Sequence, residues 1–298
     1  MQRRQISADE VGRLGEVTPA DIVSALGAVS HGHVYDLDPG RYVGMPQWDG
    51  HPTYLLTSYR TPHGTRVQRD VELIESGNAE DLRFLSELMV TSMHVGTHID
   101  ALCHVTCGGD GWFGGYAPEQ ELGDFGPRRC DAASIPPILL PATLLDVASF
   151  RGVEQLAGGS GIGAEELQAV EEGQQTPIAP GSAVFVRTGV MRHWHDLDQF
   201  AAHAGAGLDL TAARWLREER LAILVGSDTP TVEQVPTTST VNPHPVHDYL
   251  LRQHGVHLLE NADLEQLAAD AVHRFLLICL PLKLAGATAS LVRPVAVV

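Results

Sequence analysis

The second half of the chain alternates short apolar runs with segments of helical periodicity. Apolar runs that are short and bounded by turn residues are typical of buried strands. They lie at 183–188, 221–226, 256–260, 275–282 and 292–298. Between them, apolar residues recur at helical spacing over 164–172, 210–219 and 246–254. Because the predicted strands and helices alternate, the pattern predicts an α/β protein with a mixed sheet.

The first half carries shorter and less regular segments. Within residues 1–33, Thr18 precedes Pro19 as a cap and first helical residue, so we expect an N-terminal helical extension there. Strand-like segments follow at 34–37 and 54–59. No repeat, low-complexity tract or long proline-rich linker divides residues 34–298. We therefore predict a single domain over that range.

Composition and charge narrow the function classes. The 298 residues are 44% hydrophobic and 19% charged, which is typical of a folded globular protein. A net charge of -17 repels phosphate backbones and argues against a nucleic-acid partner. The most apolar stretch, 275–284, contains Lys283 and falls short of the roughly 20 residues of a membrane-spanning helix. With no apolar signal-peptide run near the start, we expect a cytoplasmic protein without a membrane partner.

The four cysteines form no CxxC pair, and we expect free thiols. Cys103 and Cys107 flank His104, so a thiolate metal ligand is an open alternative.

Three histidines and one aspartate fall within the segment His94–His104. On a helical turn, the spacing of His94 and His98 would place both rings on one face, and Gly96 would permit a similar convergence in a tight loop. Asp100 follows His98 by two residues. Imidazole nitrogen and carboxylate oxygen are ligands of zinc and manganese, and two histidines with one carboxylate leave positions open for water. The segment therefore predicts a catalytic metal site, with chance clustering among the chain's 15 histidines as the alternative.

The same segment, HVGTHIDALCH, resembles the HxGTHxDxPxH signature of the cyclase-type metal-dependent hydrolases, which include bacterial kynurenine formamidases and isatin hydrolases. It departs from the signature at Leu102-Cys103, where the family has a proline before the last histidine. Further similarities lie at 44–46, 186–189, 226–229, 247–251 and 259–261. The resemblance covers the chain from about residue 34 to its end.

The resemblance implies a set of metal ligands. His94, His98 and Asp100 would bind a first divalent ion, Zn²⁺ or Mn²⁺. His247 and Glu260 would complete a second position, with Asp100 able to bridge the two. The alternatives are that His247 is a helix-surface histidine and that Glu260 is a solvated carboxylate.

It also implies the swivelling β/β/α cyclase-like fold and a homo-oligomer, either a homodimer or a homotetramer. His104 would act on protons as the catalytic residue. His244, His254 and His257 lie near His247 in the sequence and are rival candidates for its role.

The implied function is hydrolysis by a metal-bound hydroxide, which attacks an amide or lactam carbonyl of a small cyclic or aromatic substrate. One alternative is a metal-dependent cyclase or lactone hydrolase in a biosynthetic pathway, and another is a non-catalytic metal-binding protein. Trp48, Trp112 and Phe113 are candidates for an apolar substrate pocket, although such residues are more often ordinary core. Asp228 either lies beside the site at a strand end or serves in a turn.

Overall fold

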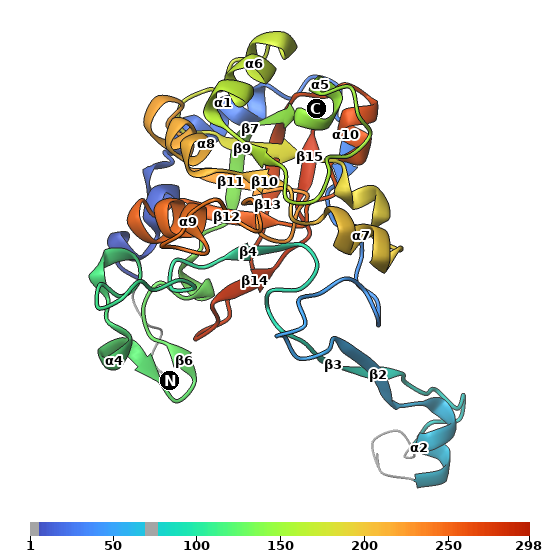
Figure 1. Ribbon diagram of the computed structural model, residues 1–298. Helices are drawn as coiled ribbons and strands as arrows, with labels where there is room; N and C mark the ends of the chain where they lie inside the picture. The colour runs from blue at the N-terminus through green and yellow to red at the C-terminus, as the bar shows by residue number, and fades with distance from the viewer. Residues whose placement is uncertain (1–5, 69–76) are drawn as a thin grey trace.

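The computed structural model describes residues 6–68 and 77–298, and within them nine strands form one mixed sheet. The strand order across this sheet is β1-β15-β13-β7-β9-β11-β12-β4-β14. The strands are β1 Val34–Asp36, β4 His98–Asp100, β7 Ile138–Asp146, β9 Ala183–Arg187, β11 Leu224–Ser227, β12 His257–Glu260, β13 Arg274–Cys279, β14 Ala289–Leu291 and β15 Val295–Val297. Helices pack around this sheet (Figure 1). The α/β fold with a mixed sheet that the sequence predicts is confirmed.

The helices and the minor strands complete the architecture. The helices are α1 Pro19–Gly27, α2 Pro62–Gln68, α4 Pro118–Glu121, α5 Val147–Phe150, α6 Ala164–Gln174, α7 Leu197–His203, α8 Leu210–Arg214, α9 Pro245–His247 and α10 Glu265–Ala269. Two-stranded pairs are formed by β2 Leu55–Arg60 with β3 Ser86–Val90, by β5 Leu122–Gly123 with β6 Gly126–Pro127, and by β8 Gly161–Ile162 with β10 Gly207–Leu208. None of the described helices is long and apolar enough to cross a membrane.

Four parallel strands, β7, β9, β11 and β12, form the centre of the large sheet. Their side chains are almost all buried, as expected for strands covered on both faces. The antiparallel strand β4 lies beside β12, so the amino end of β4 meets the carboxyl end of β12. Ligands of open α/β sheets bind beyond the carboxyl ends of parallel strands. The topology therefore brings the histidine–aspartate segment to that edge of the sheet.

Three strands are shorter than the apolar runs that predicted them, because a left-handed residue or a proline lies near the end of each. The strand predicted at 221–226 begins only at Leu224, because Leu221 has a left-handed φ of 54°. The strand predicted at 275–282 ends at Cys279, just before Pro281, which has no N–H to donate. The strand predicted at 292–298 begins at Val295, directly after Pro294. The helices predicted over 210–219 and 246–254 are also present, but each changes to a wider π-helical turn part-way.

The N-terminal residues pack against the sheet domain. Thr18 caps α1 as predicted and accepts a hydrogen bond from the Asp21 backbone N–H at 3.3 Å. Leu14 belongs to the main hydrophobic core, and buried Glu10 accepts a hydrogen bond from the Cys130 N–H. The division of the chain at residue 33 stays a prediction.

The hairpin β2–β3, together with α2, extends away from the body of the molecule (Figure 1). Its strand positions are exposed on both faces, including Leu55, Leu56, Leu88, Met89 and Val90. A two-stranded hairpin alone is marginally stable in water, so this arm exposes apolar surface that a neighbour could cover.

Candidate metal centre

The histidine–aspartate segment is a tight loop that leads directly into β4. Gly96 has a left-handed φ of 59°, and a Cβ at this position would approach the Arg41 side chain to 3.1 Å. Arg41 donates hydrogen bonds to the Thr97 carbonyl and to Asp38, which holds the loop against the body of the molecule. Of the two backbone forms that the spacing allows, the structure therefore has the loop form rather than the helical turn.

β4 presents His98 and Asp100 on the same face, because alternate residues of a strand point the same way. Its antiparallel register with β12 pairs His98 with Glu260. Across this pair, His98 Nε2 lies 3.1 Å from Glu260 Oε2. Sheet pairing thus brings Glu260, which lies 162 residues after His98 in the chain, to the histidine segment.

The two oxygens of Asp100 face different neighbours. Asp100 Oδ1 lies 3.1 Å from His94 Nδ1, and Asp100 Oδ2 lies 3.6 Å from His247 Nε2. His247 Nε2 is in turn 3.3 Å from Glu260 Oε1. The five ligand candidates of the sequence, His94, His98, Asp100, His247 and Glu260, therefore converge on one cluster, with Asp100 in the middle.

Several buried atoms of the cluster lack hydrogen bonds. Among the described residues, His98 Nε2, both carboxylate oxygens of Asp100 and Glu260 Oε1 are buried without a hydrogen-bond partner. Buried polar atoms are normally satisfied, and leaving one bare costs about 1–3 kcal/mol. Two buried carboxylates facing imidazole nitrogens make a donor set that suits a divalent cation such as Zn²⁺ or Mn²⁺. These residues fit the ion that the sequence motif implies.

Among the described residues, three groupings of ligand atoms are close enough to share an ion: two lie within the cluster, and the third, formed by Glu233, His244 and His247, adjoins it. The ligand atoms of His94, Asp100 and His104 lie within 4.8 Å of one another, and so do those of Asp100, His247 and Glu260. Asp100 is common to both groups, which is the arrangement that a bridging carboxylate requires. Because the first group contains His104, the position of His104 also suits a metal ligand.

The charges of the cluster shift its pKa values. Burial alone would raise the pKa of Asp100, but attraction to His104, His94 and His98 outweighs burial and lowers it. Burial alone would lower the pKa of His98 and of His247. For His98, attraction to Glu260 and Asp100 reverses the shift and raises the pKa. For His247, the hydrogen bond to Glu233 and attraction to Glu260 raise the pKa well above its ordinary value. Asp100 is therefore held in its anionic form, while His98 and His247 hold their protons more tightly than ordinary histidines, and a metal ion would replace those protons.

His104 lies at the solvent side of the cluster. Its ring centroid is 4.1 Å from that of His94, and the residue is exposed. Desolvation of the crowded ring lowers the pKa of His104 to about 4, and the His94 and His247 rings act in the same direction while Asp100 opposes them. Its imidazole is therefore neutral at pH 7 and able to accept a proton.

Comparison with known proteins identifies the family and the fold of the chain. A family model described as a cyclase matches residues 35–234. The chain belongs to the cyclase family. The solved structure of a novel cyclase is 24% identical, with a TM-score of 0.83 over 97% of this chain and 96% of that one. Isatin hydrolase A from Ralstonia solanacearum is 20% identical, with a TM-score of 0.66 over 95% and 98%.

A third structure of this fold is described as a potential metal-dependent hydrolase with cyclase activity. It is 20% identical, with a TM-score of 0.55 over 89% of this chain and 98% of that one. Curated proteins offer no significant match to the chain. The predicted cyclase-like fold is confirmed by these likenesses.

Around the cluster lie two residues that the sequence does not predict, Glu233 and His51, and one, His257, that it gives as a rival candidate for the role of His247. Glu233 bonds His247, the His257 ring bonds the Asp100 carbonyl at 2.7 Å, and His51 lies with its ring 5.7 Å from that of His94. Burial lowers the pKa of His51, and the charges of His94 and His98 lower it further. Neither Glu233 nor His51 has a spacing that marks it in the sequence.

The three predicted substrate-binding residues lie in different surroundings. Trp48 is 70% exposed, and its ring meets that of His51 edge-on at 5.0 Å, so it borders the cluster through His51. Trp112 is buried in the main hydrophobic core, and Phe113 lies against Gly255. The structure therefore brings Trp48, of these three, towards His94.

Asp228 follows β11 and is fully buried. It accepts hydrogen bonds from the backbone N–H groups of Thr188 and Gly189 and from the Thr188 hydroxyl. Burial raises the pKa of Asp228 to about 6, although these hydrogen bonds oppose the shift. These contacts tie the ends of β9 and β11 together, which agrees with the structural alternative for this residue.

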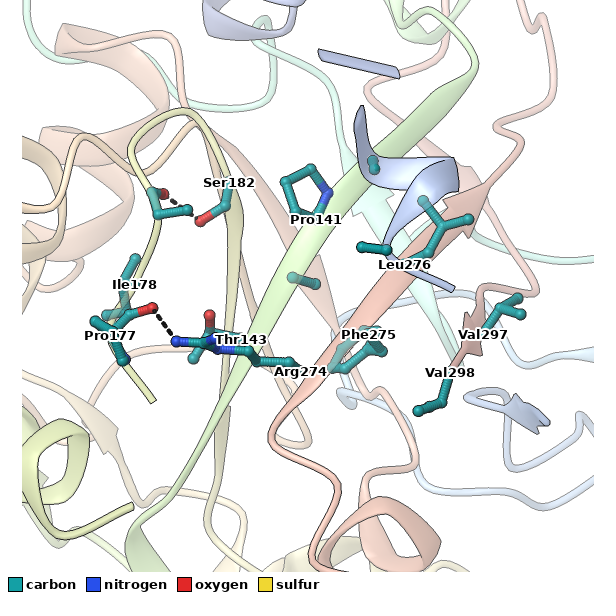
Figure 2. Close-up of a pocket in the computed structure, with 14 residues that line it drawn as sticks. Pro141, Thr143, Pro177, Ile178, Ser182, Arg274, Phe275, Leu276, Val297 and Val298 are labelled. Atoms are coloured by element: carbon teal, nitrogen blue, oxygen red, sulfur yellow. Dashed lines mark hydrogen bonds between the residues drawn. The ribbon is translucent and has the colours of Figure 1, made fainter. Parts of the chain in front are cut away.

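A cavity of about 570 Å³ lies away from the metal cluster, beside β7 and β13 (Figure 2). Pro141, Thr143, Phe275 and Val298 are among its lining residues, and Arg274 is the charged one. The lining includes none of the histidine or carboxylate residues of the cluster. A cavity of this size could hold a small molecule, but its lining lacks the groups that metal-assisted hydrolysis needs.

Proposed function

We propose that the chain is a metal-dependent hydrolase that acts on an amide or lactam carbonyl of a small cyclic or aromatic substrate. The observation that carries the proposal is the buried cluster in which Asp100, His98 and Glu260 direct unpartnered polar atoms at one another. A structural metal site needs no exposed base, whereas His104 provides a solvent-accessible imidazole beside the cluster.

His94, His98, Asp100, His247 and Glu260 would hold one or two ions, Zn²⁺ or Mn²⁺. When bound, a divalent ion polarises a carbonyl and lowers the pKa of water, which makes hydrolysis feasible at neutral pH. His104 accepts the proton of the attacking water and returns it to the leaving nitrogen. Such positioned proton transfer contributes typically about 10²–10⁴ in rate.

Two features support a planar, carbonyl-containing substrate. Trp48 and His51 offer aromatic surface next to His94, on which a flat ring can stack. The likeness to isatin hydrolase A supports the same class of substrate. The second candidate, cyclase or lactone chemistry on the same cluster, is favoured by the likeness to the hydrolase described with cyclase activity. A non-catalytic metal-binding protein is the third candidate.

A panel of amides, lactams and lactones, assayed before and after metal removal, tests the function. We expect one amide or lactam to be hydrolysed, with the activity lost after dialysis against a chelator and restored by Zn²⁺ or Mn²⁺. Preference for a lactone or ring closure would support the second candidate, and metal binding without any turnover would support the third. Activity that survives complete metal removal, verified by elemental analysis, would contradict the proposal.

We also infer a homodimer or homotetramer, in which the exposed hairpin arm packs on a second copy. Leu56 and Met89 are cross-strand partners on this arm and both are about half exposed. Light scattering after size exclusion should give two or four times the 32.1 kDa chain mass. Leu56→Arg with Met89→Arg should reduce this mass to one chain, whereas Val241→Arg, at an exposed loop position, should leave it unchanged. A monomeric wild-type protein at micromolar concentration would refute the inference.

A further inference from the structure

Glu233 is a buried carboxylate just outside the ligand cluster. Its side chain is 1% exposed and accepts three hydrogen bonds. They come from His247 Nδ1, from His244 Nδ1 at 3.1 Å and from the Val246 backbone N–H at 3.0 Å. The carboxylate therefore serves as the acceptor for all three groups.

The two nitrogens of His247 face opposite neighbours. Nδ1 faces Glu233, while Nε2 faces Asp100 Oδ2 at 3.6 Å and Glu260 Oε1 at 3.3 Å. The Glu233 carboxylate already accepts from the Val246 N–H and faces His247 Nδ1 as an acceptor, so this contact requires the proton of His247 on Nδ1. The Nε2 lone pair is then free to bind an ion within the cluster. This is the pattern in which a second carboxylate orients a metal-binding histidine and increases its basicity.

The backbone around Glu233 is held in an unusual conformation. The Glu233 N–H bonds the Thr231 carbonyl across Val232, which has a φ of 57° and is fully buried. A β-branched residue in the left-handed region is strained, and such strain persists only where surrounding structure enforces it. The Thr231 hydroxyl and an isolated bridge with Leu208 fix the same turn. The fold therefore holds the Glu233 carboxylate in one place.

We propose that Glu233 is a positioning residue that fixes the tautomer and orientation of His247 for metal binding. This inference rests on the proposed function, because it assigns His247 as a ligand. A purely structural role is the competing explanation, since the bond from Val246 also anchors the start of α9 at Pro245. The two roles differ in what the removal of the negative charge does to metal affinity.

Zn²⁺ and, separately, Mn²⁺ should be titrated into metal-free full-length protein against a competing chelator. Glu233→Gln keeps the shape of the side chain but removes its charge, and we expect it to weaken affinity by about 10–100-fold at the position of His247. The melting temperature of the metal-free variant should stay close to that of wild type. His244→Asn is the matched control, because it removes the half-exposed partner of the same carboxylate and should leave affinity within about twofold.

A double variant separates positioning from general damage. In a His247→Ala background, Glu233→Gln should cause no further loss of affinity, because the residue through which it acts is absent. A further loss in that background, or unchanged affinity in Glu233→Gln alone, would overturn the inference. So would a large loss in His244→Asn, which would make Glu233, His244 and His247 a metal site of their own. If wild-type protein binds neither ion, the proposed function itself fails.

Discussion

Replacement of Asp100 with alanine is expected to abolish metal binding and turnover together. Asp100 belongs to both groups of candidate ligands within the cluster, and its two oxygens face His94 on one side and His247 on the other. Its loss therefore removes a ligand from both positions that an ion could take within the cluster. Stabilisation of the reacting carbonyl by an ion is worth several kcal/mol, so we expect turnover to fall by at least about 10³-fold.

Elemental analysis of the purified variant, together with turnover of the substrate found in the panel, checks this result. Asp209→Ala is a suitable control, because Asp209 caps α8 through the Ala212 N–H and takes no part in the cluster. That change should cost about 1 kcal/mol of stability and leave the metal content unchanged. An Asp100→Ala protein that retains full metal content would contradict the assignment of Asp100 as the shared ligand.

The local part of the site could be predicted from the sequence because its residues lie close together in the chain. His94, His98 and Asp100 occupy one loop and the strand that follows, so a spacing argument reaches all three. Glu260 could be proposed only through the resemblance to the family. Glu260 lies in the site because the register of β4 and β12 pairs it with His98. Register depends on strand neighbours that no local pattern specifies.

Other features have no local signal at all. Glu233 meets His247 across 14 positions in the sequence, after an irregular turn that propensity does not predict. The long central strand β7 is not predicted either, because Pro141 within its apolar run argues against a strand. In the structure, β7 pairs with β9 only from Ala142 onwards, so Pro141 faces a partner on one side, at β13. Proline is tolerated at such a position because no N–H is needed there.

His104→Ala should differ from Asp100→Ala in metal content, because it is expected to retain the ion, but it should also lose most of its turnover. The variant is expected to keep its bound ion while turnover falls about 10²–10⁴-fold, because the role proposed for His104 is to transfer protons rather than to bind the ion. The lowered pKa of His104, about 4, keeps the imidazole neutral at pH 7, which is the form that the proposed role requires. Its place beside His94, however, also suits a ligand.

Metal content and turnover, measured on the same preparation, decide between the two roles. His254→Ala serves as the control, because His254 stacks on Tyr249 and takes no part in the cluster, so both quantities should match wild type. Loss of the ion from His104→Ala would make His104 a ligand, and retention of both ion and turnover would remove it from the mechanism. Retained ion with lost turnover would mean that Asp100 and its neighbours hold the metal, and that the exposed imidazole beside them makes the site catalytic.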